Sequence, residues 1–130
     1  KSSMAGLMSA LHYARTRWIF VVACDMPFVT SGLFELMALK RSNDFGAVVP
    51  VSAEGVLQPM CTLYRVAACI AECEAAVRKG ELSNQKLLKR VNALEMPFEE
   101  ISGLAGSDRF FTNINTPEEY LAARSILARI

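Results

Sequence analysis

The chain has 130 residues, enough for one domain with a buried core, because a compact domain of that size hides roughly two-thirds of the surface of its unfolded chain. Hydrophobic residues make up 52% of the sequence and charged residues 21%, which excludes a disordered or fibrous protein. The net charge of +1, without a dense block of lysine and arginine, argues against nucleic acid as a partner.

The chain opens with the pattern of an amphipathic helix over residues 3–16. Residues 18–24 then form a continuous apolar run, rich in β-branched and aromatic side chains, which is typical of a strand covered on both faces in a parallel sheet. This run ends abruptly at Asp25. It is about a third of the roughly 20 residues that a membrane helix needs, and no leader pattern precedes it, so we expect a cytoplasmic protein without a membrane span.

A loop after Asp25 leads into a helix that ends near Lys40. Two strands follow at residues 47–51 and 57–65, and Pro59 interrupts the second. The next elements are two helices, at residues 66–79 and from the N-cap Ser83 to residue 90, and a weak strand at residues 93–96.

The last part of the chain begins with a polar loop that contains Gly103 and Gly106, followed by an extended segment at residues 110–115. Thr116 before Pro117 then predicts a helix start, with acidic residues in the first turn.

Strands that alternate with helices predict a single α/β domain over residues 1–130: a three-layer αβα, Rossmann-like arrangement with a mostly parallel sheet. Ligands of such sheets bind beyond the carboxyl ends of the strands. Because such a domain usually opens with a strand and a glycine-rich loop, we expect this chain to be N-terminally incomplete.

The four cysteines are predicted to be reduced, buried thiols of a cytosolic protein. Cys24 closes an apolar strand, Cys61 lies in another, and Cys69 and Cys73 share one helical face. A metal site on Cys69 and Cys73 would need two more ligands, and the single histidine, His12, lies in a different helix without a companion.

Asp25 is the main candidate for chemistry, because a carboxylate at the carboxyl edge of the sheet can bind Mg²⁺ together with substrate phosphates. The alternative is that it accepts hydrogen bonds from loop amides near Val29. Asn113 and Asn115 flank Ile114 in an extended segment, so their amides are expected on one face, as a clamp for one ligand. In the alternative they satisfy the loop backbone, and Thr116 is simply an N-cap.

Two weaker candidates are Gly6 and Gln58. Gly6 lies at the start of the first helix, where free amides can meet an anion at close range. Gln58 before Pro59 can present an amide at the end of a strand, although a routine turn explains the pair equally simply.

Four segments occur in an order that resembles the molybdenum cofactor guanylyltransferase family: residues 4–7 (MAGL), 22–28 (VACDMPF), 57–64 (LQPMCTLY) and 111–118 (FTNINTPE). The resemblance implies a nucleotidyltransferase (GT-A-like) fold and transfer of GMP from GTP to molybdopterin-bound molybdenum, with Mg²⁺ and release of pyrophosphate. It implies that Asp25 binds the metal and the nucleotide, that Gly6 lines the nucleotide crevice, and that Asn113 and Asn115 lie near the pterin. Gln58 is a further candidate for substrate binding, and molybdoenzyme-maturation proteins are candidate partners.

The sequence departs from this family at its start, because the Gly-rich signature with an Arg and a following Lys that cradles the triphosphate is not in the chain. Three alternatives therefore stay open. The chain could be a catalytically silent module that binds the pterin or a partner enzyme, a related transferase that uses CTP, or a sugar nucleotidyltransferase of the same fold.

Overall fold

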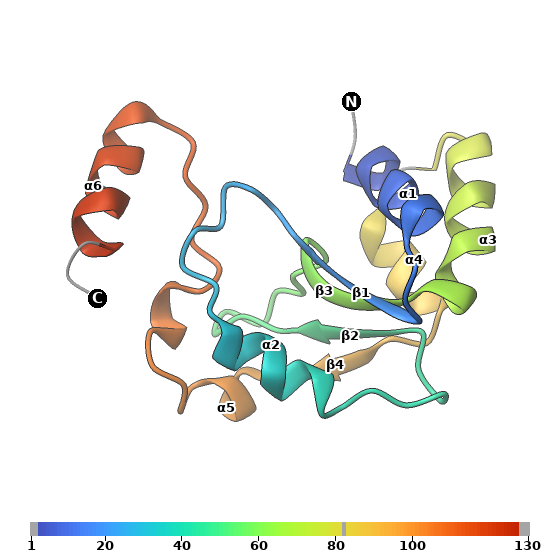
Figure 1. The fold of residues 1–130 in the computed structure, drawn as a ribbon, viewed down its shortest axis with the longest axis horizontal. Helices are drawn as coiled ribbons and strands as arrows, with labels where there is room; N and C mark the ends of the chain where they lie inside the picture. Colours follow the sequence, from blue (N-terminus) through green and yellow to red (C-terminus); the bar gives the residue numbers. More distant parts are fainter. Residues whose placement is uncertain (1–2, 82, 128–130) are drawn as a thin grey trace.

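The computed structural model describes residues 3–81 and 83–127, and helices and strands are mixed along the chain (Figure 1). The strands are β1 (Trp18–Val22), β2 (Ala47–Pro50), β3 (Cys61–Arg65) and β4 (Leu94–Met96). The helices are α1 (Ser3–Tyr13), α2 (Ser31–Ala38), α3 (Val66–Arg78), α4 (Asn84–Arg90), α5 (Phe98–Ile101), the 3-10 turn η1 (Ser107–Arg109) and α6 (Pro117–Leu127). Within the described residues, no helix is both long and apolar enough to cross a bilayer.

The four strands form one sheet in the order β1-β3-β2-β4. Strands β1, β2 and β4 run in the same direction and β3 runs against them, so the sheet is mixed rather than mostly parallel: β2 and β4 pair in parallel, whereas β3 pairs antiparallel with both of its neighbours. The prediction for residues 18–24 was wrong in one respect, because β1 lies at an edge and pairs antiparallel with β3. An apolar run shows that both faces of a strand are covered, but it does not show which strand is its neighbour.

Helices cover both faces of the sheet and create two apolar cores, which confirms the predicted three-layer arrangement (Figure 1). On one face, α1, α3 and α4 pack against Ile19 and Val21 of β1 and Tyr64 of β3. On the other face, α2 and α5 pack against Trp18 and Phe20 of β1 together with other strand residues. Alternate residues of one strand thus enter opposite cores, as the pleat of a strand requires.

The predicted loop around Gly103 and Gly106 is confirmed, because residues 102–106 form turns, but the two short helices beside it, α5 before and η1 after, were not predicted. Ile101 and Phe110 are fully buried there, in the core on the α2 side of the sheet. A helix of only four residues is too short to show a hydrophobic period, so the sequence pattern could not reveal α5.

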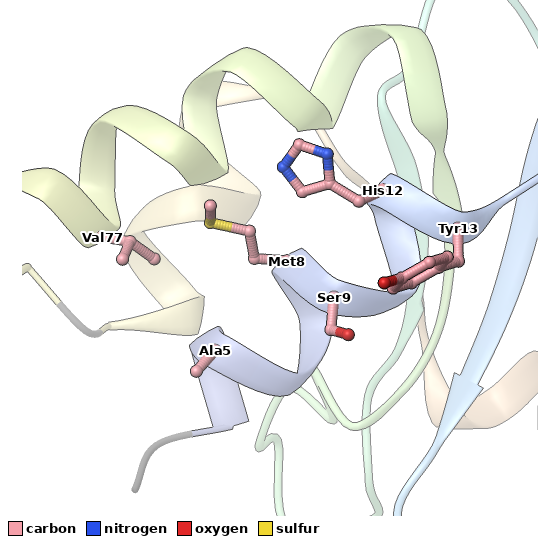
Figure 2. Close-up of a pocket in the computed structure, with 6 residues that line it drawn as sticks. All are labelled: Ala5, Met8, Ser9, His12, Tyr13 and Val77. Carbon is pink, nitrogen blue, oxygen red and sulfur yellow. The ribbon is translucent and has the colours of Figure 1, made fainter.

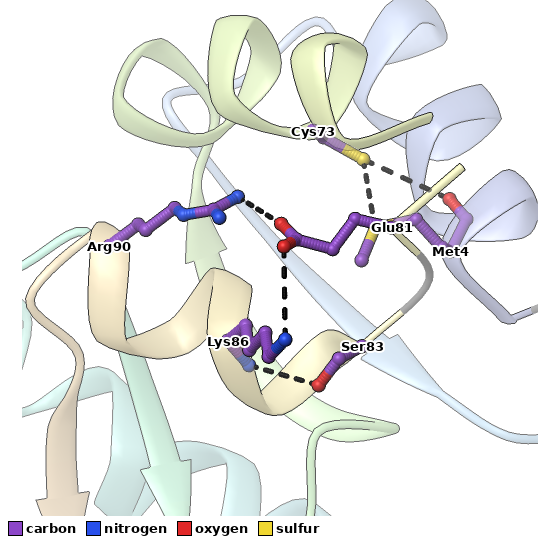
Figure 3. Close-up of polar contacts among 6 residues, drawn as sticks. All are labelled: Met4, Cys73, Glu81, Ser83, Lys86 and Arg90. Carbon is purple, nitrogen blue, oxygen red and sulfur yellow. Dashed lines mark hydrogen bonds and ion pairs between the residues drawn. The ribbon is translucent and has the colours of Figure 1, made fainter. Parts of the chain in front are cut away.

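Polar contacts join the helices on the α3 side of the sheet (Figure 3). The side chain of Glu81, just after α3, contacts the guanidinium of Arg90 at the end of α4 and lies 3.9 Å from the Lys86 ammonium. Ser83 is the N-cap of α4, as predicted, and its hydroxyl accepts a hydrogen bond of 3.2 Å from the Lys86 amide. On α3, the Cys73 thiol lies 3.4 Å from the Met4 sulfur of α1.

The hydrogen bond from Arg90 lowers the pKa of Glu81, and this sets the pH dependence of the contact. A carboxylate with a lowered pKa stabilises the fold at pH values above its unfolded pKa, and the contribution disappears as pH falls through the folded pKa. We expect Arg90→Gln to lower the unfolding midpoint at pH 7, and the difference from the parent protein to shrink toward pH 3. Urea unfolding at both pH values measures this; an equal difference at both would contradict the prediction.

Gly46 and Gly6 offer a matched pair of glycine substitutions in opposite environments. A Cβ on Gly46 would lie 2.6 Å from the Val91 Cβ and also meet the Val91 carbonyl oxygen, whereas a Cβ on Gly6 would have no atom within 4 Å. We expect Gly46→Ala to lower the free energy of unfolding by about 1–3 kcal/mol through overpacking. Gly6→Ala is expected to raise it by about 0.5–1 kcal/mol, because alanine favours a helix interior. Urea unfolding of both variants tests this, and a destabilised Gly6→Ala would contradict it.

Candidate functional site

Asp25 follows the carboxyl end of β1 in a turn that is fixed on both sides. The Ala23 amide donates to the Met60 carbonyl over 2.8 Å, and the Met26 amide donates to the Ala23 carbonyl over 3.1 Å. Met26 and Phe28 are buried, and Met26 belongs to the core on the α2 side. The apolar residues after Asp25 thus anchor the turn and hold the carboxylate at the edge of the sheet.

The structure brings Asn113 to Asp25 across 88 positions of the sequence. The Asn113 side-chain amide donates to Asp25 Oδ2 over 3.0 Å, and the Ile114 backbone amide donates to the Asp25 carbonyl over 2.8 Å. The other carboxylate oxygen, Oδ1, is buried and accepts no hydrogen bond from the described residues. The partner of Asp25 is therefore a distant side chain rather than the loop amides near Val29.

The buried, unpartnered oxygen of Asp25 fits the chemistry of a hard cation, which prefers carboxylate oxygen. Within the described ranges, residues 3–81 and 83–127, no group of three or more His, Cys, Asp or Glu side chains is placed to hold a metal. A cation at Asp25 would therefore take most of its ligands from elsewhere. This fits Mg²⁺, which is commonly held by one or two carboxylates together with substrate phosphates and water.

Asn115 and Thr116 lie at the start of α6, in a capping box with Glu119. The Glu119 amide donates to the Thr116 hydroxyl over 3.1 Å, which confirms the predicted helix start. The Glu119 carboxylate accepts hydrogen bonds from the backbone amides of Asn115, over 2.7 Å, and Thr116, over 3.1 Å. The Asn115 side chain is exposed and forms no hydrogen bond with the described part of the chain.

The other two candidates do not join Asp25 and Asn113. Gly6 is exposed on α1, and no hydrogen bond between described residues links it to Asp25. The Gln58 side chain donates to the Val56 carbonyl over 3.2 Å, and the backbone carbonyl of Gln58 accepts from the Thr62 hydroxyl over 2.7 Å. Gln58 therefore has the contacts of a routine turn residue, the alternative that its neighbour Pro59 suggested. Their roles in ligand binding stay predictions.

Sequence patterns missed a hollow of about 580 Å³ between α1 and α3 (Figure 2). Its lining includes Met8, Tyr13 and Val77, none of which belongs to the Asp25 turn. His12 also lines it, and its Nε2 lies 3.0 Å from the Glu74 carboxylate of α3. No local signal could reveal this pair, because its residues lie on separate helices that meet only in the folded chain.

The cysteines were predicted correctly at three positions and wrongly at one. Cys61, Cys69 and Cys73 are buried, and all four thiols are free. Cys24 is exposed, because β1 ends at Val22 and the chain turns outward before Asp25. Burial raises the pKa of Cys61 to about 12 and that of Cys69 to about 12, with a smaller effect of Cys73 on Cys69.

A sheet covered by helices on both faces, with a carboxylate beyond the end of a strand, defines a three-layer α/β domain, a class in which ligands bind beyond the carboxyl ends of the strands. The sequence matches the family described as the MobA-like NTP transferase domain over residues 1–95. The chain therefore belongs to the MobA-like NTP transferase family.

Known proteins with similar sequences and structures agree with this family. A probable molybdenum cofactor guanylyltransferase from Bacillus cereus is 32% identical over 127 residues, which cover 96% of this chain and 60% of the relative. The crystal structure of molybdopterin-guanine dinucleotide biosynthesis protein A from Archaeoglobus fulgidus superposes with a TM-score of 0.80 at 28% identity, over 99% of this chain and 64% of that one.

A more distant structure shares the fold alone. It is 2-C-methyl-D-erythritol 4-phosphate cytidylyltransferase from Thermus thermophilus, with a TM-score of 0.66 at 22% identity, over 98% of this chain and 69% of that chain. The present chain spans about 60% of the length of the curated relatives that it matches.

The exposure of Cys24 next to Asp25 predicts selective thiol labelling. We expect Cys24 to react rapidly with Ellman's reagent at pH 8, and the three buried thiols to react only as the protein unfolds, because burial suppresses the reactive thiolate. Counting the thiols released before and after adding urea measures this. Cys24→Ser should remove the rapid phase, whereas a rapid phase that persists in this variant would contradict the prediction.

Proposed function

We propose that this domain belongs to a nucleotidyltransferase that transfers GMP from GTP to a molybdopterin-type molybdenum cofactor. The family match supports a transferase of nucleoside triphosphates, and the two similar proteins named above support the guanine nucleotide and the pterin acceptor. The observation that carries the proposal is the carboxylate of Asp25 beyond the end of β1, which has one oxygen without a hydrogen-bond partner in the described chain. The free cysteines support a protein of the reducing cytoplasm.

The proposed reaction needs positioning and charge neutralisation more than an acid or a base. A terminal phosphate oxygen of the acceptor attacks the α-phosphorus of GTP. The bond between the α-phosphorus and the bridging oxygen breaks, and pyrophosphate leaves with the electron pair of that bond. Negative charge builds up on the phosphate oxygens during this exchange. A site that performs the reaction therefore has to hold three charged groups close together: the acceptor phosphate, the α-phosphate and the departing pyrophosphate.

Asp25 would hold Mg²⁺, which when bound neutralises phosphate charge and orients the triphosphate. The proposal places the segment from Asn113 to Asn115 on the acceptor side, where a free carboxamide can both donate and accept hydrogen bonds. Gly6 would leave room for the close approach of the nucleotide, which agrees with the open space around its Cα. Gln58 would take part only if its hydrogen bond to Val56 is released.

Asp25→Asn tests the proposal, because the change removes the charge and keeps the shape of the side chain. We expect the rate of GMP transfer from GTP to fall by about a hundredfold or more, the typical loss when one electrostatic stabiliser of a transition state is removed. The measurement is formation of the guanine dinucleotide cofactor by the full product of the gene, with purified molybdenum cofactor and Mg²⁺.

Asp44→Asn is the matched control, because Asp44 is an exposed carboxylate in the turn before β2, outside the proposed site. It should transfer GMP at the parental rate. An Asp25→Asn protein as fast as this control would contradict the role of Asp25. Transfer of CMP from CTP at a higher rate than GMP would contradict the choice of nucleotide.

A further inference from the structure

Two strongly held segments meet at Asp25, although 88 positions separate them in sequence. Met26, directly after Asp25, and Phe110, three residues before Asn113, are buried in the same core. The Ile114 amide then bonds to the Asp25 carbonyl over 2.8 Å. The backbone around both residues is therefore fixed before any ligand binds, which is the condition for a side-chain contact to have a defined orientation.

The Asn113 side chain determines which carboxylate oxygen of Asp25 stays without a hydrogen bond. An ionised carboxylate only accepts hydrogen bonds, so the group of Asn113 that faces Oδ2 over 3.0 Å is the N–H donor. With Oδ2 engaged and Oδ1 without a partner in the described chain, the two oxygens are no longer equivalent. A hydrogen bond of this kind orients a metal-binding carboxylate and tunes its strength.

Asn115 has a different environment, although it lies only two residues further along the chain. Its backbone amide is held by the Glu119 carboxylate over 2.7 Å, while its side chain is exposed and forms no hydrogen bond with the described residues. The two asparagines thus do not form the symmetric pair that their spacing suggests. One carboxamide is engaged by Asp25, and the other is available to a ligand.

We propose that Asn113 is a positioning residue, which holds the Asp25 carboxylate in the orientation that binds the divalent cation, and that Asn115 alone of the two contacts the acceptor. This inference rests on the proposed function, because it assumes that Asp25 binds the cation. The two asparagines of this segment therefore have different roles: Asn113 orients the Asp25 carboxylate, and Asn115 contacts the acceptor. Removing the first should therefore change metal affinity, and removing the second should change acceptor affinity.

The experiment compares Asn113→Ala with Asn115→Ala in the full product of the gene. Binding of Mn²⁺, a spectroscopic substitute for Mg²⁺, is measured by electron paramagnetic resonance in the presence of the α,β-methylene analogue of GTP. We expect Asn113→Ala to raise the Mn²⁺ dissociation constant by about 10- to 100-fold, the usual effect of losing a hydrogen bond to a metal ligand. Asn115→Ala should leave this constant unchanged and raise the KM for the acceptor instead.

A double-mutant cycle separates positioning from direct binding. If Asn113 acts through Asp25, Asn113→Ala has no further effect on Mn²⁺ binding in an Asp25→Asn protein. A further loss in that background, or equal Mn²⁺ affinities for the two alanine variants, would overturn the positioning role while leaving the proposed function intact. Mn²⁺ binding that is unaffected by Asp25→Asn would overturn the metal role and this inference with it.

Near-ultraviolet circular dichroism confirms that each variant is folded before these comparisons. Should Asn113→Ala fail to fold, Asn113→Asp replaces it, with Asn115→Asp as its control, because both keep the shape of the side chain and add the same charge. The Asn113→Asp side chain cannot donate to Asp25 and repels it in the absence of metal. Only this variant should then have an altered Mn²⁺ affinity, and equal affinities for the two would overturn the proposal.

Discussion

Burial of the β2–β3 pair on both faces is the constraint on which the rest of the structure depends. Residues 47–50 and 61–64 are all buried, so this pair is stable only between two layers of helices. One layer is α1, α3 and α4, and the other is α2 with α5 (Figure 1). Strand β1 pairs with β3, and this pairing places the carboxyl end of β1 at the edge of both cores. Asp25 follows at this position.

The site is a consequence of the core on the α2 side rather than of local sequence. Met26 and Phe110 lie in this core although they are far apart in the sequence. Their burial places the nearby polar residues Asp25 and Asn113 at the edge of the core. Asp25 and Asn113 then meet over 3.0 Å in a contact that neither segment could form alone. The apolar residues therefore provide the rigidity of the site, and the polar residues provide its chemistry. The single carboxylate explains why a cation here would depend on substrate phosphates.

Local signals predicted the elements well wherever the determinant lies within a few neighbouring residues. Ser83 and Thr116 were identified as helix starts because a hydroxyl can accept the amide three residues later, and both do so. The same reasoning failed for Cys24 and for α5. Cys24 is apolar in its context yet exposed, because the strand ends two residues before it. Helix α5 was missed because tertiary burial of Ile101, rather than periodicity, stabilises it.

The sequence by itself determined the three-layer class, the approximate bounds of the long helices and the position of Asp25 after an apolar strand, because hydrophobic period and capping are encoded over short stretches. Only the tertiary structure decided the strand order, the edge position of β1 and the different environments of Asn113 and Asn115. The physical reason is that Asn113 and Asn115 are the same residue type in one extended segment, so no local pattern distinguishes them. Which of them meets a carboxylate 88 positions away depends on how both segments pack into one core.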